Sequence, residues 1–136
     1  MTKQDKAIAG ITLTHAVLGT AWTFWVASQI GFPAVFVGSN LLLAVAGIVG
    51  GIGWFRRQRW AAHVTIAFYF VQLVHVLTPK FQWSFTLGSN LNIALGWIDS
   101  GQLALNLFAL AMIAWSSSRV FAPNNSFKPR PHRGEA

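Results

Sequence analysis

The sequence predicts an all-α integral membrane protein, a bundle of four transmembrane helices. Of its 136 residues, 54% are hydrophobic and only 10% are charged, whereas a soluble domain carries roughly 25% charged residues. No Lys, Arg, Asp or Glu occurs from Ala7 to Phe55, and only Lys80 and Asp99 occur from Trp60 to Trp115. Uncharged apolar runs of this length favour membrane spans over a soluble core.

The first half of the chain contains two predicted spans. The first covers residues 7–28, after a cytoplasmic N-terminus of residues 1–6. Gly31 and Pro33 indicate a turn, and the second span covers residues 34–55. Each has the roughly 20 apolar residues that a helical crossing requires. The first stretch exceeds the about 7–15 apolar residues of a cleaved signal peptide, so we expect an uncleaved anchor.

Two further spans are predicted in the second half. Arg56-Arg57-Gln58-Arg59 indicates a tight polar loop before the third span, residues 60–77. A longer connection then reaches Gly88-Ser89-Asn90, a helix-start signal, and the fourth span covers residues 92–116. The membrane domain is therefore residues 7–121. Residues 122–136 form a basic, proline-rich cytoplasmic tail.

The distribution of Lys and Arg predicts the orientation, because cytoplasmic loops are enriched in these residues. They occur in the N-terminus, in the central loop and in the tail, whereas the two outer connections contain only Lys80. An even number of spans places all three basic segments on one side, with both termini in the cytoplasm. The net charge of +7 is therefore explained by basic segments at the surface of a lipid bilayer, and we expect no binding to nucleic acid. A bacterial inner membrane is the expected location.

A short repeat has two interpretations. Val37-Gly38-Ser39-Asn40-Leu41 opens the second span, and Leu87-Gly88-Ser89-Asn90-Leu91 precedes the fourth, fifty residues later. A duplicated hairpin would place two helical hairpins in parallel, as in some transporters. Alternatively, Gly-Ser-Asn recurs because these residues start helices well.

Polar residues in the predicted spans indicate a candidate intramembrane site. Asp99 is the only acid in any span, and a carboxylate at mid-depth costs about 2.5–3.5 kcal/mol. At about 100° per residue, Asn92, Asp99, Gln102 and Asn106 share one helix stripe. His75 and Gln72 of the third span are expected to face it. The set is either a proton or cation site or a structural anchor between helices.

Two other sets of residues have an expected role. His15 and His63 are candidate axial ligands of a b-type haem, or else an ordinary hydrogen-bonded and an interfacial histidine. Gly47 and Gly51 form a GxxxG pair, which lets helix backbones approach closely. No metal site and no catalytic residue is predicted, because motifs such as HExxH or a phosphate loop are absent and no cysteine is present.

These observations support three functional hypotheses. The first is an accessory subunit of a larger membrane complex, respiratory or oxidoreductive, in contact with other subunits or with copies of itself. The second is a small proton- or cation-coupled transporter that uses Asp99 and His75. The third is a redox subunit that binds haem or quinone. Residues 42–62 resemble the span–loop–span junction of small bacterial four-helix membrane families such as the DoxX-like proteins, which implies a helical bundle and no specific residue role.

Overall fold

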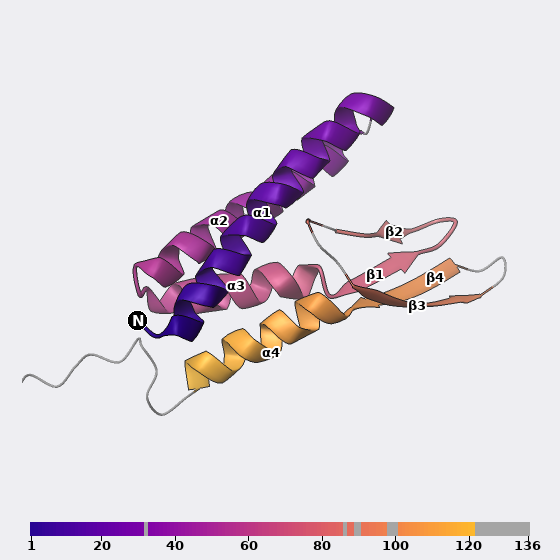
Figure 1. The fold of residues 1–136 in the computed structure, drawn as a ribbon. Helices are drawn as coiled ribbons and strands as arrows, with labels where there is room; N and C mark the ends of the chain where they lie inside the picture. Colours follow the sequence, from indigo (N-terminus) through magenta and orange to yellow (C-terminus); the bar gives the residue numbers. More distant parts are fainter. Residues whose placement is uncertain (32, 86, 89–90, 98–100, 122–136) are drawn as a thin grey trace, which may run out of the picture.

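The fold combines four helices with a four-stranded sheet. The computed structural model describes residues 1–31, 33–85, 87–88, 91–97 and 101–121. The helices are α1 (Lys3–Ile30), α2 (Ala34–Phe55), α3 (Arg59–Val71) and α4 (Leu107–Phe121), and the strands are β1 (Val74–Leu77), β2 (Gln82–Trp83), β3 (Asn92–Trp97) and β4 (Gly101–Asn106). Figure 1 shows the long α1–α2 hairpin beside the shorter α3 and α4, with the sheet continuing from the ends of α3 and α4.

The predicted four-helix transmembrane bundle is therefore wrong. The helix in residues 60–77 ends at Val71 and is followed by β1, and residues 92–106 form β3 and β4 before α4 begins. With 13 and 15 residues, α3 and α4 are shorter than the roughly 20 residues of a helical crossing. Within the described residues, only α1 and α2 are long and apolar enough to cross a membrane, judged by length and composition. The orientation deduced from four spans loses its basis.

The hydrophobic pattern explains the strands. Leu91, Ile93 and Leu95 alternate with Asn92, Ala94 and Gly96, and alternation of this kind is typical of a strand. Because the whole region lacks charges other than Asp99, its total hydropathy resembled that of a membrane span. The alternation of side chains with a period of two residues was a better indicator of the secondary structure than the total hydropathy.

The duplicated hairpin is also corrected. Val37–Leu41 lies inside α2, which begins three residues earlier at Ala34. Its counterpart, residues 87–91, precedes β3 and starts no helix at Leu91. The first copy of the Gly-Ser-Asn sequence therefore lies within a helix, whereas the second is followed by strand β3, and a pair of equivalent helical hairpins is not formed.

The sheet is antiparallel throughout, with strand order β2-β1-β4-β3. The register aligns Val74 with Leu105 and Ile93 with Leu105, so these side chains lie on one side of the sheet. We call this side the apolar sheet face; its members are Val74, Val76, Ile93, Leu95, Leu103 and Leu105. Ile93 and Leu95 are 57% and 65% exposed. The opposite face carries His75, Ala94 and Ala104.

Close packing of α1, α2 and α3 depends on small residues. A Cβ atom added at Gly47 would lie 2.7 Å from Phe68 and 2.8 Å from Ala16, and one added at Gly51 would lie 2.6 Å from Leu13. Both glycines thus face neighbouring helices of the same chain. Such approach leaves no room for larger side chains, because protein interiors are close-packed.

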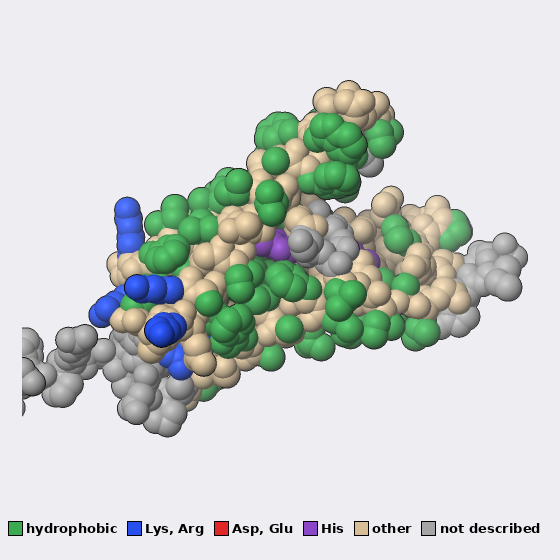
Figure 2. All heavy atoms as spheres, in the orientation of Figure 1, with side chains coloured by type: hydrophobic (Ala, Val, Ile, Leu, Met, Phe, Trp, Pro, Cys, Tyr) green, Lys and Arg blue, Asp and Glu red, His purple; other side chains and the backbone are tan. Residues whose placement is uncertain are grey.

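Basic side chains gather at the end of the molecule where the chain begins. They come from the first turns of α1, the α2–α3 turn and the last turn of α4: Lys3, Lys6, Arg56, Arg57, Arg59 and Arg119. Figure 2 shows Lys and Arg at this end of the visible face, with hydrophobic side chains over much of the rest. Here Arg119 Nε lies 3.1 Å from Asp5 Oδ1 and ties α4 to α1.

Candidate functional site

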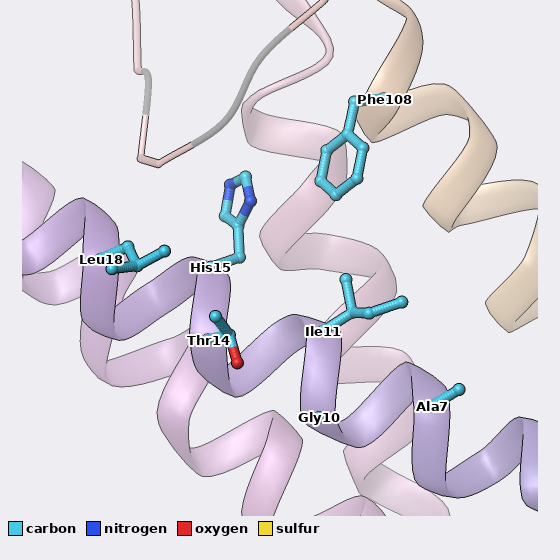
Figure 3. A pocket seen from close by; sticks show the side chains of 7 residues that line it. All are labelled: Ala7, Gly10, Ile11, Thr14, His15, Leu18 and Phe108. Atoms are coloured by element: carbon cyan, nitrogen blue, oxygen red, sulfur yellow. The ribbon is translucent and has the colours of Figure 1, made fainter.

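A buried histidine joins three helices. His15 of α1 is buried, and its ring stacks on Phe108 of α4 with centroids 5.2 Å apart and planes inclined by 13°. Phe68 and Tyr69 of α3 present their edges to the same ring. In Figure 3 the imidazole projects from α1 and Phe108 approaches from α4. Aromatic packing therefore holds the ring in one place.

Gln72 fixes which nitrogen of His15 carries the proton. Its Nε2 donates to the Phe68 carbonyl (3.1 Å), and its Oε1 accepts from the Leu87 N–H (3.1 Å). If the Gln72 amide were flipped, its NH2 group would face the Leu87 N–H, and two donors would oppose each other. Oε1 therefore accepts from Leu87, and the same oxygen lies 3.3 Å from His15 Nε2. Nε2 is thus the donor. In the neutral ring, Nδ1 is the hydrogen-bond acceptor.

Tyr69 extends the polar cluster toward the N-terminal half of α1. Its hydroxyl donates to Thr12 Oγ1 across 3.4 Å, and both residues are buried. Burial raises the pKa of Tyr69 to about 12, and the hydrogen bond to Thr12 opposes this only partly. Tyr69 therefore remains a protonated donor at neutral pH.

A hollow of about 440 Å³ lies beside His15. Its walls are mostly apolar, and its lining residues are Ala7, Gly10, Ile11, Thr14, His15, Leu18 and Phe108. Figure 3 shows that all of these come from α1 except Phe108 of α4. A Cβ added at Gly10 would meet nothing within 4 Å, so the missing side chain leaves space here. The volume lies within the roughly 300–1,000 Å³ of small-molecule sites.

The predicted polar stripe does not form on a helix. Gln102 and Asn106 belong to β4, where positions two apart share a face, and the register places His75 on that same face opposite Ala104. Gln102 is exposed, whereas Asn106 is buried and its Oδ1 accepts from the Ala109 N–H at the start of α4. Gln72 instead contacts His15. Asp99 lies outside the described residues.

The two histidines considered as haem ligands are not brought together. His63 is exposed, and its Nδ1 lies 3.3 Å from the Arg59 carbonyl near the start of α3. His15 instead contacts Gln72. Gln72 follows His63 by nine residues, which corresponds to about 13 Å along a helix at about 1.5 Å per residue. The structure therefore does not place His15 and His63 where both could be axial ligands of one haem.

Three residues that contact His15 or Gln72 in this cluster were not predicted from the sequence. Phe108 and Leu87 gave no signal of their own, because an apolar residue in an apolar segment is uninformative. Gly88 did give one, since a glycine is expected where φ is positive. Its φ is +73°, and a Cβ there would lie 2.9 Å from the His15 carbonyl oxygen.

Replacing Gln72 with leucine tests the cluster. The change leaves the buried Leu87 N–H and His15 Nε2–H without their acceptor, and each unpaired buried donor costs about 1–3 kcal/mol. We expect the free energy of unfolding in detergent to fall by about 2–4 kcal/mol. Gln102→Leu is the matched control, because Gln102 is exposed, and it should change stability by less than about 0.5 kcal/mol. Equal effects of both changes would contradict the assigned role of Gln72.

Comparisons with models of protein families, with curated proteins and with solved structures found no match to this chain.

Proposed function

We propose that this chain is a membrane-inserted accessory subunit of a larger complex, anchored by the α1–α2 hairpin and docked on its partner through the sheet. A bacterial inner membrane is the proposed location. The proposal is supported by the composition of α1 and α2, by the charge distribution and by the exposed apolar sheet face.

The outer surfaces of α1 and α2 suit a lipid environment. Leu42 is 75% exposed, Trp22 is 59% exposed, and Val17, Phe24 and Val45 are also more than half exposed. Both helices lack charged residues between Ala7 and Phe55. The basic cluster lies at the end opposite the α1–α2 turn, where it suits the anionic headgroups of a cytoplasmic leaflet.

The apolar sheet face is the observation that carries the proposal of a protein partner. Water disfavours a continuous apolar surface of this kind. Lipid does not suit it either, because the unpaired N–H and C=O groups of the edge strands β2 and β3 need hydrogen bonds. β3 contains no charge and no proline that would block pairing. A neighbouring protein satisfies both the apolar face and the edge.

The test is purification of the tagged full-length chain from native membranes in mild detergent, followed by mass spectrometry. A stoichiometric partner is expected for the wild type. Leu95→Lys places a charge on the apolar sheet face and should reduce recovery of the partner at least about tenfold, since one unpaired interfacial charge costs several kcal/mol. Gln102→Lys, on the opposite face, should retain it. Absence of any partner, or its full retention by Leu95→Lys, would refute the proposal.

A second candidate function is binding of a flat apolar molecule such as a quinone. The hollow beside the stacked His15 and Phe108 favours it. Added decyl-quinone should raise the unfolding temperature of the purified chain, because a ligand that binds only the folded state stabilises it. His15→Leu should abolish the shift, and His63→Leu should preserve it. A shift that survives His15→Leu would place the ligand elsewhere.

A further inference from the structure

The second ring nitrogen of His15 determines which kind of ligand the hollow beside it accepts. Nε2 donates to Gln72 Oε1 across 3.3 Å, and the Leu87 N–H holds that oxygen in place. Nδ1 therefore presents a lone pair in the neutral ring. Among the described residues no group donates to Nδ1, and Nδ1 is not one of the fully buried side-chain atoms that lack a partner. A ligand can therefore reach this acceptor.

The imidazole is the polar part of an otherwise largely apolar wall. His15 and Phe108 line the hollow of about 440 Å³, and their rings already stack on each other with centroids 5.2 Å apart. A flat molecule therefore lies along the edges of the two rings and not between them. Thr14 also lines this hollow, but its hydroxyl both donates and accepts. The choice between a donor and an acceptor on the ligand is left to His15 Nδ1.

A second hollow adjoins the first and extends it along α1. Its volume is about 500 Å³, and its lining residues are Leu18, Ala21, Trp22, Trp25 and Gly88. Leu18 lines both hollows, and Figure 3 shows it next to His15 on α1. A Cβ added at Gly88 would lie 3.3 Å from His15 Nδ1. Because Gly88 borders this nitrogen and lines the second hollow, Nδ1 lies where the two hollows meet.

The second hollow suits an apolar chain. The rings of Trp22 and Trp25 lie with centroids 5.0 Å apart, and no charged side chain lines the hollow. From Leu18 to Trp25 the helix rises about 10 Å. A flat ring beside His15 can therefore continue into an apolar tail that follows α1.

We propose that the two hollows bind a quinol with an apolar tail in preference to the corresponding quinone. A ring hydroxyl of the quinol donates to His15 Nδ1, and the tail passes Leu18 toward Trp22 and Trp25. A quinone carbonyl would place its lone pairs against that of Nδ1. This inference rests on the second candidate function, to which it adds the reduced form as the preferred ligand.

The first test compares three ligands on the purified full-length chain in detergent, without oxygen, by the shift in unfolding temperature during titration. The measurements are made at about pH 8, where a histidine with the ordinary pKa of about 6.5 is neutral. Decyl-quinol should bind at least about tenfold more tightly than decyl-quinone, because the quinone leaves buried acceptors unpaired. The dimethyl ether of decyl-quinol lacks the donor and should bind no more tightly than the quinone. Equal affinities for all three would overturn the proposal.

The second test changes the residue that positions the proton of His15. Gln72→Leu removes the acceptor of Nε2, so the proton can move to Nδ1 and donate to a quinone carbonyl. The preference for the quinol should then disappear in samples whose circular dichroism matches the wild type. Phe108→Leu is the matched control, since it weakens the packing of both forms and should keep the preference. A preference that persists in folded Gln72→Leu would contradict the role of Nδ1.

The third test concerns the tail. Ala21 is exposed and lines the second hollow, so Ala21→Phe fills space that the tail needs and should weaken decyl-quinol binding at least about tenfold. Ala34→Phe is the control, because Ala34 is exposed on α2 and lines neither hollow. Undiminished binding by Ala21→Phe would contradict the path of the tail.

The outcomes separate this inference from the functions on which it builds. If neither the quinol nor the quinone binds, the second candidate function fails together with the inference. If both bind equally, the inference alone fails. Because these assays need no partner, either result leaves the proposed subunit role untouched.

Discussion

Arg119→Met should lower the free energy of unfolding by about 3 kcal/mol, near the lower end of the 3–5 kcal/mol for breaking a buried ion pair. Asp5 is 2% exposed and Arg119 16% exposed, so the change removes a guanidinium from a largely buried carboxylate. The effect should not be larger, because the Thr2 N–H still donates to Asp5 Oδ2 across 2.9 Å. Chemical unfolding in detergent, followed by circular dichroism, measures it.

The double variant Asp5→Asn/Arg119→Met is the control for this prediction. It removes the buried carboxylate charge together with the guanidinium, so it should recover part of the stability lost in Arg119→Met. A pair that is replaced as a whole costs less than one that is broken. If Arg119→Met alone were as stable as the wild type, Asp5 and Arg119 would contribute nothing to the attachment of α4 to α1.

Gly47→Leu should lower the free energy of unfolding by about 3 kcal/mol, the upper end of the usual cost of overpacking. Even the first added carbon would lie 2.7 Å from Phe68 and 2.8 Å from Ala16, so α1 and α3 must both move. Thermal unfolding and the yield of monodisperse protein measure the effect. The two neighbours belong to different helices, which makes a local adjustment insufficient.

Gly38→Leu in the same helix should act in the opposite direction. A Cβ there would meet nothing within 4 Å, and leucine is favoured over glycine in a helix by about 0.8 kcal/mol. We expect a slight stabilisation. Destabilisation by both substitutions to the same extent would show that helix propensity, rather than the space around Gly47, determines the result.

The candidate site could be predicted only in part. His15, Gln72 and His75 were recognised as polar residues in apolar surroundings, a property that is visible in the sequence. Their grouping was not, because Gln72 was assigned to His75 and Asp99, whereas its amide contacts His15 and Leu87.

The sequence by itself determined the first half of the fold. Residues 34–55, predicted as the second span, coincide with α2, and residues 7–28 lie within α1, because long apolar runs interrupted by Gly31 and Pro33 have one obvious local structure. Only the tertiary structure decided the second half. The choice between helix and strand for residues 74–77 and 92–106 depends on pairing, since Val74 meets Leu105 from about thirty residues away. The two-residue alternation in residues 91–96 favours a strand, but a strand is stable only when another strand satisfies its backbone hydrogen bonds, and the local pattern does not identify that partner.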